Sequence, residues 1–154
     1  MKTTHKLITA AGMFILALFF LRYFFIICSV IWSLKGIFLN SPVEKSAEVS
    51  KSIKAVIKEF NKIDILFNHA GTIIVKPLHK STEDDYDRLM DINVRSAFLT
   101  CSKVIPHMLE NGSGSIVITS SIGGEKGFAY ESLYCMTKGA VLQLARSIAV
   151  EYRD

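Results

Sequence analysis

The sequence lacks the cysteine and histidine patterns of disulfide-linked and metal-binding proteins. Its 154 residues include three cysteines, Cys28, Cys101 and Cys135, and four scattered histidines. None of these residues forms a CxxC pair or a cysteine/histidine cluster at metal-ligand spacing. An odd, scattered set of cysteines indicates reduced thiols and not a disulfide framework. We therefore predict no disulfide framework and no metal site.

Acidic residues are absent from the first 41 positions. That segment contains Lys2, Lys6, Arg22 and Lys35, so it carries the whole formal net charge of +4. The other 14 basic residues are balanced by all 14 acidic ones, and they form no basic cluster with interleaved aromatic residues. A basic stripe of that kind is the usual footprint of a nucleic-acid-binding protein. We predict that this protein does not bind nucleic acid.

Charge is also scarce in a long apolar run near the N-terminus. The 28 residues from Leu7 to Leu34 contain Arg22 as their only charged residue. A membrane-spanning helix needs about 20 mostly apolar residues, and the window Ile8–Ile27 meets that length. A secretory signal would need a small-residue cleavage site, and none follows Leu21. We therefore predict a single-pass transmembrane helix at residues 8–27 and a membrane location.

A second interpretation of residues 1–41 stays open. A reading-frame or gene-model break could have replaced the original coding sequence of this segment. Ile37–Asn40 resembles the end of a strand, whereas the residues before it resemble no part of an α/β domain. That interpretation predicts a cytoplasmic protein. The domain organisation is accordingly a hydrophobic N-terminal segment at residues 1–41, either an anchor or an artefact, followed by a soluble domain at residues 42–154.

The soluble part alternates between helical and strand-like patterns. Apolar residues recur at helical spacing in residues 46–60, about 92–109 and about 133–152, and Ser81 or Thr82 caps a further helix start. Short apolar runs at residues 63–68 and 115–120 predict buried strands. The order helix–strand–helix–helix–strand–helix is typical of an α/β fold, here a partial doubly wound parallel sheet of Rossmann-like type.

Small polar residues follow both predicted strands, at the sheet edge where ligands of such folds bind. The stretch SLYCMTKGA then places Tyr134 and Lys138 four residues apart, on one face of a helix. Considered alone, this pair fits an exposed aromatic beside a solvated lysine better than proton-handling machinery, because tyrosine and lysine at helical spacing are common. Its meaning depends on the other motifs.

Four motifs in order resemble the central part of a classical short-chain dehydrogenase/reductase. They are Asp64-Ile-Leu-Phe-Asn68-His-Ala70-Gly71, Asn93 in Asp-Ile-Asn-Val, Ser120-Ser121 after the second strand, and Tyr134-x-x-x-Lys138. The resemblance covers residues of about 42–154. It implies an oxidoreductase that uses NAD or NADP to interconvert a small-molecule alcohol and a carbonyl.

The resemblance also implies roles for individual residues. Tyr134 would transfer the proton, Lys138 would promote that transfer and bind the nicotinamide ribose, and Ser121 would donate to the substrate oxygen. A neighbouring ammonium makes a phenol a better proton donor near neutral pH because it favours the phenolate. Asn93 would hold a relay water beside Lys138.

The implied cofactor-binding residues are Asn68, Ala70, Gly71, Tyr134 and Lys138. The first three would line the adenosine-ribose side of the cofactor, with the glycine allowing close backbone approach.

Three features depart from the family pattern. His69 stands where a second asparagine is usual, and Pro42-Val43 stands where an Asp-Val pair commonly contacts the adenine. No Thr-Gly-x-x-x-Gly-x-Gly or GxGxxG motif occurs, although a pyrophosphate normally binds at such a loop. The sequence thus resembles only a central segment, without the glycine-rich motif or the C-terminal part. The alternative function is an inactive membrane-anchored remnant or a helix-mediated interaction module. Helices at about 93–109 and 133–152 would form a homo-oligomer contact.

Overall fold

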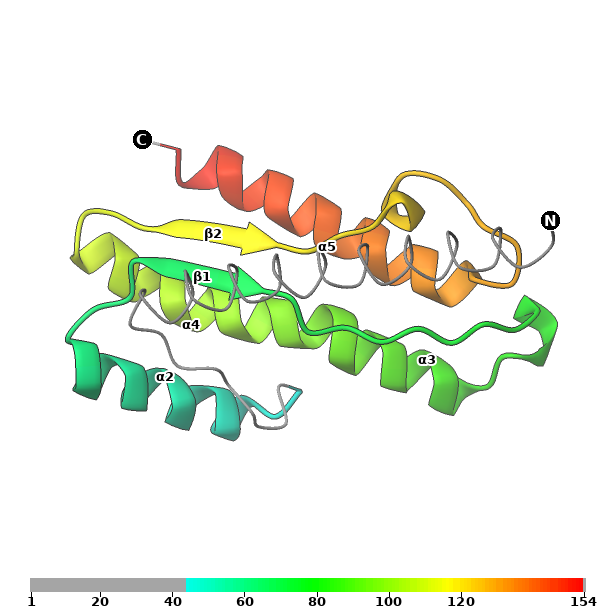
Figure 1. Ribbon diagram of the computed structural model, residues 1–154, viewed down its shortest axis with the longest axis horizontal. Helices are drawn as coiled ribbons and strands as arrows, with labels where there is room; N and C mark the ends of the chain where they lie inside the picture. The colour runs from blue at the N-terminus through cyan, green and yellow to red at the C-terminus, as the bar shows by residue number, and fades with distance from the viewer. Residues whose placement is uncertain (1–43, 154) are drawn as a thin grey trace, which may run out of the picture. The chain divides into compact units, whose positions relative to one another are not determined.

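The computed structural model describes residues 44–153. In chain order its elements are α2 (Ser46–Phe60), β1 (Ile65–Asn68), η1 (Leu78–Lys80), α3 (Glu83–Leu89), η2 (Met90–Arg95), α4 (Ser96–Glu110), β2 (Ser115–Ile118), η3 (Ile122–Gly124) and α5 (Ser132–Glu151) (Figure 1). This order is the one that the apolar periodicity predicts. The predicted span Ile8–Ile27 lies outside the described residues, and within residues 44–153 no helix is long and apolar enough to cross a membrane.

The two strands pair in parallel, with Phe67 opposite Val117 and Asn68 opposite Ile118. This pairing confirms a partial parallel sheet of Rossmann-like α/β type. Both strands are shorter than predicted. One backbone hydrogen bond continues the pairing at each end. The amide of Thr119 donates to the carbonyl oxygen of Asn68 at 2.9 Å, and the amide of Ser115 donates to the carbonyl oxygen of Asp64 at 2.9 Å.

Helix α2 is amphipathic, as its sequence predicts. Val49 and Ile53 are buried on its inner face. They join Ile63, Val104 and Met108 in one apolar cluster, so α2 packs against α4 beneath the strands (Figure 1). The helix ends at Asn61, which adopts a left-handed conformation with φ of 65°.

The two faces of the strand pair have different surroundings. Leu66 and Ile116 pack on the apolar cluster. Ile65, Phe67 and Val117 point to the opposite face and are 56%, 58% and 48% exposed. Within residues 44–153 the helices therefore cover one face of the strand pair, and the other face is open.

Of the two predicted caps, Ser81 and Thr82, it is Thr82 that caps helix α3. Its hydroxyl accepts from the Asp85 amide at 3.2 Å, and the Asp85 carboxylate accepts from the Thr82 amide at 2.9 Å. This reciprocal pair is a capping box. Asp85 also accepts from the Lys76 ammonium at 2.6 Å, which ties the loop after β1 to the start of α3.

A π-helical segment joins α3 to α4 without a break. The sequence predicts a separate helix beginning near Ile92, but the chain is helical throughout residues 83–110, with the wider winding of η2 at Met90–Arg95. Periodicity does not reveal the inserted turn, because a π-helical bulge changes the pattern by a single residue. Such bulges are frequent at functional sites, and this one contains Asn93.

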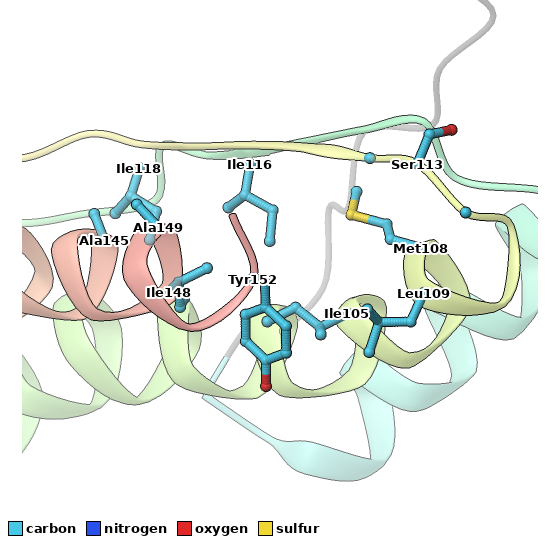
Figure 2. Close-up of a pocket in the computed structure, with 12 residues that line it drawn as sticks. Ile105, Met108, Leu109, Ser113, Ile116, Ile118, Ala145, Ile148, Ala149 and Tyr152 are labelled. Carbon is cyan, nitrogen blue, oxygen red and sulfur yellow. The ribbon is translucent and has the colours of Figure 1, made fainter. Parts of the chain in front are cut away.

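The inner face of β2 borders an apolar groove. The groove has a volume of about 390 Å³. It lies between β2 and the C-terminal parts of α4 and α5 (Figure 2). Ile116 and Ile118 of β2 face Ile148 of α5 and Ile105 of α4 across it, with Tyr152 at one side.

Candidate active site

Some of the predicted site residues line a cavity at the carboxyl ends of β1 and β2. It has a volume of about 240 Å³ and is lined by His69, Gly71, Thr72, Ile73, Thr119, Ser120, Tyr134 and Lys138. Of the predicted residues, Gly71, Tyr134 and Lys138 line this cavity directly. A parallel sheet brings these segments together because both strands end at the same edge.

Tyr134 and Lys138 lie one turn apart in the first part of α5. The Lys138 ammonium is 5.8 Å from the centroid of the Tyr134 ring and donates to the carbonyl oxygen of Thr119 at 3.0 Å. Lys138 is only 5% exposed, and this burial lowers its pKa. The geometry supports the interpretation of Tyr134 and Lys138 as a pair, because both groups face one cavity.

The segment after β2 packs closely against α5, and Gly124 makes this close packing possible. The hydroxyl of Ser120 donates to the carbonyl oxygen of Lys138 at 2.9 Å. A Cβ at Gly124 would lie 2.6 Å from the Ser120 hydroxyl oxygen and 2.7 Å from that carbonyl oxygen. Only glycine fits here, and sequence reasoning did not single out Gly124.

Ser121 and Tyr134 both lie next to Gly123. The hydroxyl oxygen of Ser121 accepts from the amide of Gly123 at 3.1 Å. A Cβ on Gly123 would lie 3.6 Å from that oxygen and 3.5 Å from Cε1 of Tyr134. The serine and the tyrosine thus border the same buried backbone position, although Ser121 does not line the cavity itself.

Asn93 is buried beneath the cavity, and its side-chain amide is occupied. Its Oδ1 accepts from the Thr72 amide at 2.7 Å, while Nδ2 donates to the Thr72 carbonyl oxygen and to the Thr137 hydroxyl, both at 2.9 Å. These bonds join η2, the loop after β1 and α5. The relay-water role of Asn93 stays a prediction, and sequence reasoning missed Thr72 and Thr137.

Asn68 directs its side chain into the fold. Its Nδ2 donates to the Cys101 sulfur at 3.2 Å, and its Oδ1 accepts from the Thr100 hydroxyl at 2.6 Å. Burial raises the pKa of Cys101 to about 11, although the Asn68 amide opposes that rise. Asn68 and Ala70 do not line the cavity, so their predicted contacts with a cofactor stay predictions.

Gly71 lets the backbone come close to the charged end of Lys138. A Cβ at this position would lie 3.3 Å from the Lys138 nitrogen and 3.5 Å from Oδ1 of Asn93. The glycine therefore keeps space open beside the Lys138 ammonium. Within the described residues this ammonium donates one hydrogen bond, to the carbonyl oxygen of Thr119. An ammonium has three N–H donors, so two remain for a ligand such as a ribose hydroxyl.

Comparison with known proteins shows the family to which the chain belongs. A family model described as short chain dehydrogenase matches residues 30–154. The chain belongs to the short-chain dehydrogenase family. The match begins within the apolar N-terminal run.

Two curated relatives of the chain come from different bacteria. The chain is 38% identical over 117 residues to 2-(R)-hydroxypropyl-CoM dehydrogenase of Xanthobacter autotrophicus, covering 74% of this chain and 47% of that protein. It is 34% identical over 128 residues to 3-oxoacyl-[acyl-carrier-protein] reductase of Chlamydia pneumoniae, covering 80% and 52%. The chain thus spans about half the length of the curated relatives it matches.

Solved structures of the family superpose on the described fold. ElxO with NADP bound matches with a TM-score of 0.71 at 32% identity, covering 73% of this chain and 46% of the other. NAD⁺-bound xylitol dehydrogenase matches with a TM-score of 0.69 at 33% identity, covering 71% and 43%. Both NADP and NAD therefore occur in structures of this family.

Proposed function

We propose that this chain forms the central part of an NAD(P)(H)-dependent oxidoreductase that interconverts a small-molecule alcohol and a carbonyl. The observation that carries the proposal is the convergence of Tyr134, Lys138 and Gly71 on one cavity at the strand ends. Family membership supports the reaction class, and the relatives named dehydrogenases and reductases support both directions of the reaction.

In the proposed reaction Tyr134 donates a proton to the carbonyl oxygen during reduction and accepts it during oxidation. Lys138 assists that transfer, because its ammonium lies 5.8 Å from the centroid of the Tyr134 ring on the same side of α5. The Ser121 hydroxyl donates a hydrogen bond to the substrate oxygen as charge develops there. Gly123, between the two, sets their separation.

The residues present at this end of the sheet fit the nicotinamide-ribose part of a dinucleotide, while the glycine-rich loop that normally holds the pyrophosphate is absent from this sequence. The cavity offers the Lys138 ammonium, the hydroxyls of Thr119 and Ser120, and the open space above Gly71. When bound, the nicotinamide would supply or accept the hydride. We propose NAD or NADP as the cofactor, since solved relatives contain one or the other.

A turnover assay with matched variants tests this function. Protein that contains this chain is incubated with NADH or NADPH and a panel of aliphatic, alicyclic and aromatic carbonyl compounds, and loss of the reduced nicotinamide is followed by absorbance. We expect turnover of at least one carbonyl compound. Tyr134→Phe should abolish it, because the proton donor is removed while the ring stays.

Tyr130→Phe is the matched control, since Tyr130 is an exposed tyrosine outside the cavity lining. Its turnover should match that of the wild type. Equal turnover in the wild type and Tyr134→Phe would contradict the proposed role of the tyrosine. Absence of turnover with every compound would favour the alternative, an inactive interaction module.

We also propose that α4 and α5 form a homo-oligomer contact. Phe98 of α4 and Met136 and Val150 of α5 are 55%, 45% and 69% exposed, so apolar surface is available on both helices. Light scattering should then give a mass above that of the monomer, and Phe98→Glu should lower it. A monomeric wild type would contradict this contact.

A further inference from the structure

The cavity carries positive charge without a compensating acid. Among residues 44–153, the lining contains Lys138 but no aspartate or glutamate. Tyr134 and His69 are the other titratable side chains in that lining, and the end of β2 contributes only the hydroxyls of Thr119 and Ser120. A buried cation that lacks a carboxylate partner favours an anionic ligand.

His69 is held in a defined orientation at the end of β1. Its ring stacks on Phe67, with centroids 5.3 Å apart and an interplanar angle of 27°. Its Nδ1 lies 3.0 Å from the Thr119 hydroxyl oxygen, and the tautomer decides which of the two donates. The described residues give Nε2 no hydrogen-bond partner, and the side chain is exposed. One nitrogen is therefore available to a ligand in the cavity.

We propose that His69 binds an anionic group of the dinucleotide and that its protonation tightens binding at acidic pH. This inference rests on the proposed function. Histidine gains its charge between about pH 8 and pH 5, and a protonated ring has an N–H at both nitrogens. A protonated His69 adds a second cation to a cavity that already contains Lys138. An asparagine at this position, by contrast, cannot gain charge.

The test measures binding and not turnover. NAD⁺, NADP⁺ and uncharged adenosine are titrated into the full chain at about pH 5.5 and about pH 8, and the NMR shifts of the Gly71 and Thr72 amides are followed. We expect both dinucleotides to bind about tenfold more tightly at the lower pH. Adenosine binding should change less than about twofold, because it offers no phosphate.

His69→Asn should remove the acid-dependent gain in dinucleotide affinity, because an amide side chain does not take up a proton in this pH range. His79→Asn is the matched control, because His79 lies in η1 and does not line the cavity. That variant should keep the full pH dependence.

Two outcomes separate this inference from the proposed function. Dinucleotide binding with the same pH dependence in His69→Asn as in the wild type would overturn the role of His69 and leave the proposed function standing. Absence of dinucleotide binding at both pH values would overturn both.

Discussion

Thr137 joins two of the residues proposed to act in the reaction. It is fully buried, its hydroxyl accepts from Nδ2 of Asn93 at 2.9 Å, and the same hydroxyl donates to the Tyr134 carbonyl oxygen at 2.8 Å. A single hydroxyl therefore connects the π-helical segment to the first turn of α5. A side chain here that cannot accept a hydrogen bond leaves one N–H of the buried Asn93 amide without a partner.

Replacement of Thr137 by valine should destabilise the fold. Valine keeps the volume but leaves one of the two N–H groups of the Asn93 amide without a partner, which costs about 1–3 kcal/mol of the free energy of unfolding. Thr137→Ser keeps the hydroxyl and should cost about 1 kcal/mol or less, for the lost methyl group. Urea unfolding of both variants measures the difference. Equal losses would show that the hydrogen bonds contribute little.

The two described cysteines should differ in reactivity. Cys101 is buried with its pKa raised to about 11, so little reactive thiolate is present at about pH 8. Cys135 is half-buried and should be alkylated sooner. Mass spectrometry after brief iodoacetamide treatment of the native protein reads out both sites. Faster modification of Cys101 would contradict the packing around Asn68.

At the scale of elements, glycine at position 124 allows η3 to approach α5. Gly124→Ala should destabilise the fold by about 1–3 kcal/mol, because the new methyl group would overlap backbone atoms of Lys138. Gly127→Ala is the control, since nothing lies within 4 Å of a Cβ there. Thermal unfolding of both variants tests this, and a Gly124→Ala protein as stable as the control would disprove the close approach.

The start of α3 should respond to acid through Asp85. The Lys76 hydrogen bond, followed by that from the Thr82 amide, lowers the pKa of Asp85 from 3.8 to about 2. The folded-state pKa lies below the unfolded one, so the charged form stabilises the fold above about pH 4. That contribution is lost as the pH falls from about 4 to about 2.

Asp85→Asn should therefore lower the melting temperature at neutral pH, and its difference from the wild type should vanish by about pH 2. Asp84→Asn in the same helical turn controls for loss of a charge near the helix start. Melting curves between neutral and acidic pH test the prediction. A difference that persists unchanged at low pH would rule out the titration of Asp85 as its cause.

At the scale of the whole molecule, the open face of the strand pair should govern solubility. Ile65 and Val117 point away from the helices, and exposed apolar strand surface promotes association. Ile65→Thr with Val117→Thr should reduce aggregation of the chain without loss of helical content, because threonine suits strands. Ile116→Thr, on the covered face, should destabilise the fold instead. Light scattering and circular dichroism distinguish the two effects.

Local sequence patterns were enough to predict the order of the α-helices and the two strands. Helix α2 and the position of Tyr134 and Lys138 on one face of α5 follow from the helical period of 3.6, which depends only on neighbouring residues. The family motifs then pointed to a dinucleotide-dependent oxidoreductase, and the family model matches residues 30–154.

Tertiary structure alone decided which groups each polar side chain meets. The amides of Asn68 and Asn93 are bonded to α4, Thr72 and Thr137, and the Asn93–Thr137 bond joins residues 44 positions apart. The glycine at position 124 likewise matters only because η3 approaches α5. Such contacts arise from the packing of distant segments, and no local period in the sequence records them.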